Sequence, residues 1–265
     1  DDCTGRCHLK GTLGRRNRHI VVRSVERAPL GTVDALAPIG TATVHEAIGR
    51  RGYLGADLRP IQTGARIAGT AVTVLSHPGD NIMIHAAVEV CQEGDILVVA
   101  TTAPSTHGMF GDLLASSLQV RGVRGLVIDA GVRDTADLRD MGFPVWTRHV
   151  SCQGTVKATP GSVNVPVAIG GITITPGDVV CGDDDGVVHE RERRLVGAIL
   201  GLRVCHLERR QDVKRPLGRA RERGVCGRAV ELPAPLRVVA AEAGLDAVEE
   251  VGRRLALEVL VQLRA

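Results

Sequence analysis

The stretch between residues 108 and 134 constrains this chain more than any other part of it. Its sequence is GMFGDLLASSLQVRGVRGLVIDAGVRD. Apolar residues recur at helical spacing after Asp112, and residues 125–129 form a short, branched apolar run typical of a buried strand. We expect a helix from Asp112, a strand, and a second helix capped by Asp134. In a parallel sheet, both loop-to-helix junctions would lie at the carboxyl ends of neighbouring strands, where ligands usually bind.

The two junctions carry polar groups that suit metal-assisted chemistry on a small anion. Asp112 and Asp134 offer the hard oxygen ligands that Mg²⁺ or Mn²⁺ prefers. Backbone N–H groups at residues 111–114 would face a substrate carboxylate, and Arg133 would bind an oxyanion or polarise a carbonyl. A structural interpretation stands beside this one, because an Asp at a helix start is most often a cap and Arg beside Asp is most often a surface pair.

The spacing of these residues resembles a known signature. Asp112, twenty intervening residues and then Arg133-Asp134 match the D-x20-R-D pattern of class II pyruvate aldolases in the RraA-like family. These enzymes are the 4-hydroxy-4-methyl-2-oxoglutarate and 4-carboxy-4-hydroxy-2-oxoadipate aldolases. The flanks are similar to the family over about residues 20–190: GTATVHEAIGRRGYL at 40–54, IQTGARIAGTAVTV at 61–74, HPGDNIMIHAA at 77–87, FPVW at 143–146, GTVKATPGSVNVPV at 154–167 and PGDVVCGDDDGVV at 176–188.

The resemblance implies retro-aldol cleavage of either substrate to pyruvate plus pyruvate or oxaloacetate, with oxaloacetate decarboxylation as a side activity. It also implies a divalent cofactor, Mg²⁺ or Mn²⁺, held by Asp134 directly or through water. Arg133 and Asp112 would be catalytic, Arg133 stabilising charge on the keto oxygen and Asp112 orienting a metal-bound water. The substrate would be bound by these two residues and by the backbone N–H groups of Gly111, Leu113 and Leu114.

The alternation of strands and helices, followed by a strand-rich segment, predicts an α/β layered domain with a mixed sheet. The resemblance implies the RraA-like α-β-β-α sandwich for residues 19–190, assembled as a homotrimer or homohexamer. Residues 1–18 are expected to be a disordered lead or a stretch outside the native domain. Residues 191–265 are expected to form a divergent, mostly helical C-terminal extension. An acidic residue of a neighbouring subunit completes the family's site; Glu208 is the candidate, and an ordinary surface glutamate is the alternative.

The amino-acid composition argues against nucleic acid and membranes as binding partners. Aromatic residues make up only 2% of the chain, which disfavours base-stacking nucleic-acid modules, and the net charge of +3 is too small to imply nucleic-acid binding. No apolar run approaches the roughly 20 residues of a membrane span, and the first residues lack a secretory h-region. The seven scattered cysteines suit a reduced, cytoplasmic setting. The expected partners are a small 2-oxo acid and further copies of the chain, and neither nucleic acid nor membrane.

Further local patterns give weaker predictions. Thr43 and Glu46 fit a capping box. Asn81 and His107 are candidates for the neighbourhood of the substrate, although capping is the simpler role for Asn81. The run 183–186 lacks EF-hand spacing and predicts a turn between strands. Cys3, Cys7 and His8 lack a fourth zinc ligand. We predict strands at 20–23, 66–74, 96–99, 145–148, 178–181 and twice within 163–175, and helices at 31–38, 41–49, 80–88 and 135–141.

Two other classes of protein compete with the enzyme. RraA-like regulators of ribonuclease E share the fold and inhibit by protein contact. An inert oligomeric relative with a broken tail is the third interpretation. The intact D-x20-R-D pattern favours the enzyme, because a regulator has no chemical need for it.

Overall fold

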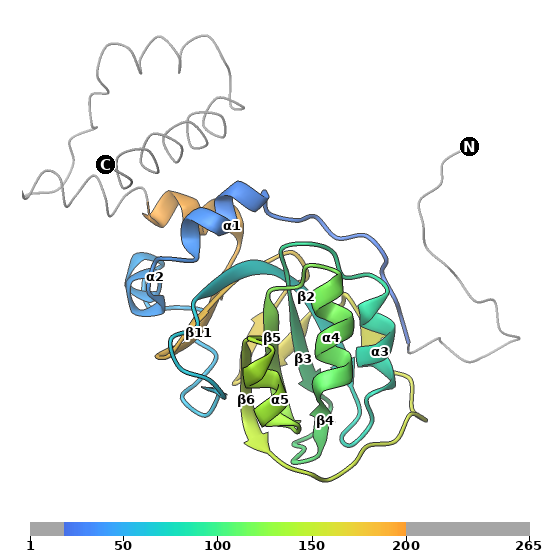
Figure 1. The fold of residues 1–265 in the computed structure, drawn as a ribbon. Helices are drawn as coiled ribbons and strands as arrows, with labels where there is room; N and C mark the ends of the chain where they lie inside the picture. The colour runs from blue at the N-terminus through green and yellow to red at the C-terminus, as the bar shows by residue number, and fades with distance from the viewer. Residues whose placement is uncertain (1–18, 200–265) are drawn as a thin grey trace, which may run out of the picture. The chain divides into compact units, whose positions relative to one another are not determined.

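One mixed sheet organises the part of the chain described by the computed structural model, residues 19–199 (Figure 1). Its strand order is β1-β6-β5-β3-β2-β10-β11, with β4 paired to β5 and β7 paired to β2. The predicted α/β class with a mixed sheet is therefore confirmed. The strands are β1 (Arg59–Pro60), β2 (Ile67–Ser76), β3 (Asp95–Thr101), β4 (Gly108–Phe110), β5 (Gly125–Val132), β6 (Val145–Val150), β7 (Ser162–Val163), β8 (Val167–Ile169), β9 (Ile172–Ile174), β10 (Val179–Asp183) and β11 (Gly186–Glu190).

The centre of the sheet is parallel. Strands β2, β3, β5 and β6 run in the same direction, whereas β10 is antiparallel to both β2 and β11. Parallel strands covered on both faces read as continuous apolar runs, which is why the sequence revealed β3 and β5. The labelled helices are α1 (Leu30–Leu36), α2 (Thr41–Ala47), α3 (Ile82–Val88), α4 (Asp112–Val120) and α5 (Thr135–Asp140), and residues 192–199 are also helical.

Two apolar clusters lie on the two faces of this sheet. Figure 1 shows α3, α4 and α5 covering one face, where Phe110 and Phe143 stack with ring centroids 5.9 Å apart. The other cluster is centred on Trp146 and includes the β8–β9 hairpin. The indole N–H of Trp146 donates to the carbonyl of Asp183 at 2.8 Å, so the one large polar aromatic in this core is satisfied.

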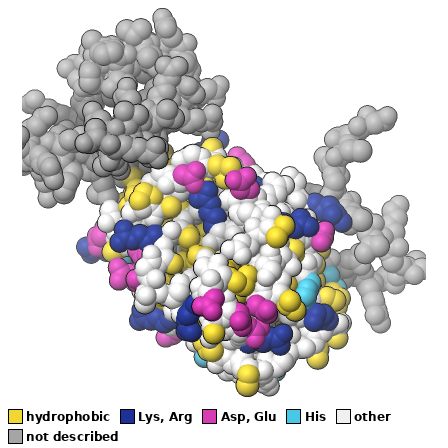
Figure 2. All heavy atoms as spheres, viewed as in Figure 1, with side chains coloured by type: hydrophobic (Ala, Val, Ile, Leu, Met, Phe, Trp, Pro, Cys, Tyr) yellow, Lys and Arg dark blue, Asp and Glu magenta, His cyan; other side chains and the backbone are white. Residues whose placement is uncertain are grey.

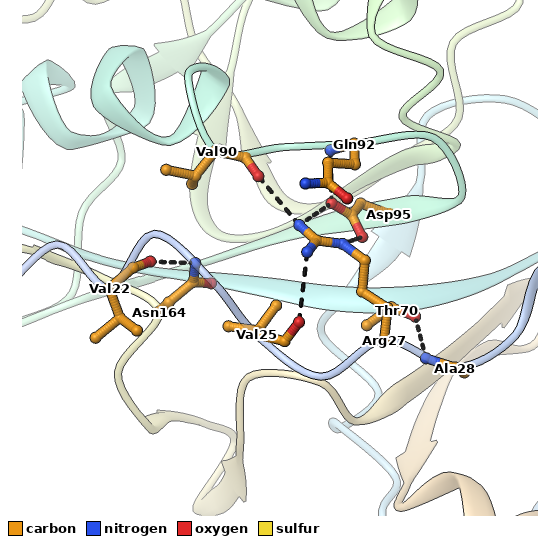
Figure 3. Close-up of polar contacts among 9 residues, drawn as sticks. All are labelled: Val22, Val25, Arg27, Ala28, Thr70, Val90, Gln92, Asp95 and Asn164. Carbon is orange, nitrogen blue, oxygen red and sulfur yellow. Dashed lines mark hydrogen bonds and ion pairs between the residues drawn. The ribbon is translucent and has the colours of Figure 1, made fainter. Parts of the chain in front are cut away.

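The segment before α1 makes the polar contacts drawn in Figure 3, and its Arg27 end lies at the amino end of β3. Arg27 Nε donates to Asp95 Oδ1 at 2.9 Å, and its Nη2 donates to the carbonyl of Val90 at 3.0 Å. Asn164 Nδ2 donates to the carbonyl of Val22 at 2.8 Å. The strand predicted at 20–23 is wrong, since only an isolated bridge between Val21 and Val163 forms there. Side-chain bonds and two backbone bonds with Val163, from Val22 N and to the carbonyl of Ile20, therefore anchor this segment.

The predicted capping box at Thr43 and Glu46 is also wrong. Helix α2 begins at Thr41, and Glu46 instead pairs with Arg50 one turn later. The carboxylate of Asp183 stabilises the helix start from the β10–β11 turn, accepting bonds from Thr41 N at 2.8 Å and Thr41 Oγ1 at 2.5 Å. Burial would raise the pKa of Asp183, but these bonds and those from the turn's backbone lower it overall. The turn predicted at 183–186 is confirmed.

The surface of residues 19–199 mixes both signs of charge. On the face shown in Figure 2, acidic and basic side chains are interspersed with scattered apolar ones. No helix in this part of the chain is long and apolar enough to cross a membrane. The predictions for residues 1–18, for the pair of cysteines with His8, for Glu208 and for most of the C-terminal extension lie outside the described residues.

Candidate active site

The two predicted helix junctions lie next to each other. Strand β4 is absent from the predicted strands, and it pairs in parallel with the end of β5. The backbone N–H of Arg133 donates to the carbonyl of Phe110 at 2.9 Å, which continues this pairing. Asp112 follows β4 and Arg133-Asp134 follows β5, so both junctions are at the carboxyl ends of paired parallel strands. The predicted position of the two junctions in the sheet therefore agrees with the structure.

Gly111 leaves the space that the Asp134 carboxylate occupies. A Cβ atom at Gly111 would lie 2.2 Å from Asp134 Oδ2 and 3.2 Å from Arg133 Cγ. The backbone of Gly111 is extended, with φ −156°, so glycine is required here for space and not for a left-handed conformation. The carboxylate of the second junction thus packs directly against the first turn of α4, and the sequence separation of these residues gave no sign of it.

Asp134 occupies the N-cap position of α5, as predicted, but its side chain makes no capping bond. Its backbone is left-handed, with φ 53° and ψ 39°. The carboxylate turns toward Arg133, whose Nε lies 3.3 Å from Asp134 Oδ2. Sparsely populated backbone conformations of non-glycine residues cost about 1–3 kcal/mol and cluster at functional sites. The simple capping interpretation of Asp134 is therefore not supported by its geometry.

The charged side chains of the site remain open to water. Arg133 is 44% exposed and Asp134 is 34% exposed, and Asp112 is half-buried in the first turn of α4. Leu113 is exposed and Leu114 is buried, so only their backbones are suited to a shared role. The first i to i−4 bond of α4 is donated by Ala115 to Gly111, which leaves the preceding N–H groups without helical acceptors. An anion would be favoured at this helix start.

Two residues that the sequence only suggested lie beside β4. Asn81 Nδ2 donates to the carbonyl of Met109 at 3.2 Å, while Asn81 makes no side-chain cap to α3. The carbonyl of His107 accepts from Gly131 N at 3.1 Å, and the His107 imidazole packs against Gly79. Both residues thus contact the β4 region that leads to Asp112. The Asn81 side chain bonds to Met109 and does not cap α3 as predicted.

A pocket of about 450 Å³ lies at the carboxyl ends of β3, β5 and β6, and none of the D-x20-R-D residues lines it. Asp129 and Arg148 both line it, and Arg148 is held between Asp129 and Asp57. Burial works against the charge, but the two carboxylates raise the pKa of Arg148 overall. Asp129 and Asp57 already bind much of the Arg148 guanidinium. These ion pairs therefore have a structural role, linking β5 and β6 to the loop that carries Asp57.

The donor set of the site fits a cation that keeps most of its water. Among residues 19–199, no three His, Cys, Asp or Glu side chains are grouped closely enough to hold a metal by themselves. Asp134 nevertheless presents a half-exposed carboxylate in the space left by Gly111. Mg²⁺ typically binds through one or two carboxylates and several waters. Asp134, which packs against the residue before Asp112, is suited to such a partly hydrated site.

The family assignment follows from comparison with known sequences. The family profile described as "RraA-like: Aldolase/RraA" matches residues 41–189, which is more than half of the chain. The chain belongs to the RraA-like family. The matched region contains every residue of the candidate site, and it ends within β11, before the C-terminal region.

Two curated relatives of this RraA-like chain are named "Putative 4-hydroxy-4-methyl-2-oxoglutarate aldolase". The one from Halalkalibacterium halodurans is 28% identical over 163 residues, 62% of this chain and 78% of the relative. The one from Burkholderia multivorans is 34% identical over 131 residues, 49% of this chain and 79% of the relative.

A solved structure supports the fold. Streptomyces coelicolor RraAS2, described as an unusual member of the RNase ES inhibitor RraA protein family, superposes with a TM-score of 0.64 at 28% identity. The match covers 72% of this chain and 100% of that one. The predicted RraA-like fold is confirmed, and of these three relatives two carry an aldolase name and one belongs to an inhibitor family.

Proposed function

We propose that this protein is a divalent-metal-dependent aldolase that cleaves 4-hydroxy-4-methyl-2-oxoglutarate or 4-carboxy-4-hydroxy-2-oxoadipate in the cytoplasm. The observation that carries the proposal is the convergence of Asp112, Arg133 and Asp134 at one sheet edge, with Gly111 leaving room for the Asp134 carboxylate. The aldolase names of two relatives support the same conclusion. The products would be pyruvate and a second 2-oxo acid, either pyruvate or oxaloacetate.

The reaction breaks one carbon–carbon bond and moves one proton at each end. The 4-hydroxyl loses its proton and becomes the new carbonyl, the C3–C4 bond breaks, and its electron pair forms the pyruvate enolate. The enolate then takes a proton at C3 and leaves as pyruvate. Oxaloacetate decarboxylation passes through the same enolate, so we expect it as a side activity. No lysine is needed for either reaction.

Each residue of the site has one role in this scheme. The N–H groups of Gly111, Leu113 and Leu114 bind the substrate carboxylate at the start of α4. Arg133 binds the keto oxygen and stabilises the charge that grows there as the bond breaks. Asp112 orients a water molecule for proton transfer. Asp134 would hold Mg²⁺ or Mn²⁺, which supplies Lewis-acid stabilisation of the enolate when bound.

The test is pyruvate release from both substrates by the full chain, with Mg²⁺, with Mn²⁺ and after treatment with a chelator. We expect release with either cation, and we expect the chelator to stop it because Asp134 belongs to a hard-cation site. Full turnover in chelator-treated protein would contradict metal dependence.

We also expect a homotrimer or homohexamer by light scattering at micromolar concentration, and a monomeric mass would contradict a site shared between subunits.

The second candidate is a protein-binding regulator of ribonuclease activity. It is favoured by the similarity to RraAS2, which this chain matches over that protein's full length. Apolar side chains that suit protein contact also border the site, since Leu113 is 75% exposed. A regulator would release no pyruvate under any of these conditions, so the same assay separates the two functions.

A further inference from the structure

We infer that Asn81 is a positioning residue for this site, holding β4 and the start of α4 in the place that catalysis requires. The inference rests on the proposed aldolase function for its kinetic consequence but not for its structural one. Asn81 touches none of the proposed reacting groups. It acts through Met109, which lies two residues before Gly111 in the chain.

Strand β4 needs such a support because it is short. It has three residues, β5 is the one described strand with which it pairs, and its first residue also donates from Gly108 N to the carbonyl of Gln153 at 2.9 Å. On its other side the carbonyl of Met109 accepts a bond from Asn81 Nδ2 at 3.2 Å, where a sheet would normally supply a backbone N–H. Met109 is fully buried, so its carbonyl would otherwise lose a partner away from water.

The side chain of Asn81 is committed to this one bond. Asn81 is 7% exposed, and its Oδ1 is buried without a hydrogen-bond partner among the described residues. A buried polar atom left unpaired costs about 1–3 kcal/mol. An apolar side chain could fill this space without burying an unpaired oxygen such as Asn81 Oδ1. The donor that Asn81 offers to Met109 therefore accounts for an amide at this position.

The backbone around Asn81 is fixed from the other side. Asn81 N donates to the carbonyl of Val156 at 3.1 Å, and Val156 N donates to the carbonyl of Gly79 at 2.9 Å. The carboxylate of buried Asp80 accepts from Ala158 N at 2.8 Å and from Thr159 N at 2.6 Å. The loop that carries Asn81 is thus tied to the loop of residues 156–159, and it can act as a rigid support.

A second contact closes the same support at the start of β4. The His107 imidazole lies 3.1 Å from the position of a Cβ at Gly79, so the ring rests on the glycine that precedes Asp80. His107 immediately precedes β4, and its carbonyl accepts from Gly131 of β5. The loop of residues 79–81 therefore contacts the residue just before β4, His107, and the middle residue of β4, Met109.

Loss of the Asn81 bond would shift the residues that follow Met109. Gly111 packs against Asp134, and the N–H groups of α4 begin directly after it. A misplacement of about 1 Å in a reacting geometry can cost about 10²-fold in rate. We therefore expect Asn81→Asp, which replaces the donor by a carboxylate facing a carbonyl, to lower kcat/KM by about 10–100-fold.

Asn164 provides a matched control. It is equally buried, its Nδ2 donates to a backbone carbonyl, that of Val22, and its Oδ1 also lacks a partner among the described residues (Figure 3). It belongs to the anchor of the N-terminal segment. Its backbone φ of 56° is one that Asp tolerates. Asn164→Asp therefore makes the same chemical change at a place that does not support β4.

The experiment compares hydrogen exchange and steady-state kinetics for the full chain, for Asn81→Asp and for Asn164→Asp. We expect faster exchange in peptides covering residues 107–115, and lower kcat/KM, only for Asn81→Asp. Unchanged exchange of that segment, or an equal change in both variants, would overturn the inference. If the wild type releases no pyruvate, the aldolase proposal fails while exchange still decides the role of Asn81. If Asn81→Asp does not fold, Asn81→Ala gives the same comparison.

Discussion

Two arginine–aspartate pairs lie at opposite edges of this sheet. Arg27 binds Asp95 through Nε and Nη2, Asp95 has no exposed surface, and Arg27 is 17% exposed. Arg133 reaches Asp134 through a single 3.3 Å contact, and both side chains are at least one-third exposed. Burial of Asp95 raises its pKa in spite of Arg27 and the N–H of Gln92. The hydrogen-bonding groups of the first pair are used within the protein, whereas those of the second pair remain accessible to a ligand.

The contrast separates charges that hold the fold from charges that are free to act. A largely buried, bidentate pair offers a ligand little to bind, and removing Arg27 would leave the Asp95 carboxylate unpaired in a low-dielectric interior. A half-exposed pair at the ends of paired parallel strands costs little to rearrange. Substitutions at the two edges should therefore affect different quantities, with stability changing at one and turnover at the other.

The largest effect is expected for Asp134→Asn. The substitution removes the negative charge proposed to hold the cation but keeps a residue that tolerates the left-handed backbone of this position. Metal-dependent pyruvate release should fall by more than about 10³-fold, as for loss of an essential site group. Thermal unfolding should hardly change, because the side chain makes no capping bond. An active Asp134→Asn protein would remove the proposed metal ligand.

The largest loss of stability is expected for Arg27→Met. It leaves Asp95 buried and unpaired, a change that typically costs about 3–5 kcal/mol. Urea unfolding followed by circular dichroism measures this loss, and turnover per folded molecule should stay at the wild-type value. The double variant Arg27→Met with Asp95→Asn serves as control and should recover part of the loss. A stable single variant with low turnover would reverse the contrast between the two edges.

Gly111→Ala should lower turnover by about 10-fold to 100-fold, since its methyl group would occupy the place of Asp134 Oδ2 and push the carboxylate aside. Stability should change little, because the half-exposed carboxylate can move into water. The matched control is Gly31→Ala, where an added Cβ meets nothing within 4 Å. Equal kinetics for both variants would mean that the packing of Asp134 against Gly111 has no part in catalysis.

The smallest effect concerns the acid side of the stability curve. The pKa of Asp183 is below its usual value of 3.8, since its hydrogen bonds outweigh burial. A carboxyl whose pKa is lowered by folding stabilises the native state above its unfolded pKa, and this contribution is lost as the pH falls through the folded pKa. Asp183→Asn should therefore lower the free energy of unfolding at pH 7. Below about pH 4, that free energy should fall less with decreasing pH than it does in wild type. Urea unfolding at several pH values measures the difference, and parallel curves would contradict it.

Local patterns predicted what depends on local chemistry. The apolar runs of β3 and β5 and the loop-to-helix junctions were predictable, because parallel buried strands leave continuous apolar segments. Strand β4 was not, since three residues carry no period. Thr41 is capped by a carboxylate 142 residues away, and Asn81 supports a carbonyl 28 residues away, so neither contact has a signal in its own segment. The space at Gly111 likewise depends on how two junctions meet.

The most direct measurement compares pyruvate release by wild type, Arg133→Lys and Arg133→Ala, with circular dichroism as the folding control. Both substrates, 4-hydroxy-4-methyl-2-oxoglutarate and oxaloacetate, are supplied with Mg²⁺ or Mn²⁺. Loss of one such donor to a developing oxyanion typically costs about 10²–10³ in turnover, and lysine lacks the planar fork that would replace it. We predict an active wild type and two folded variants impaired to that degree. A folded Arg133→Ala protein that turns over like wild type, or a wild type that releases no pyruvate, would contradict the aldolase site.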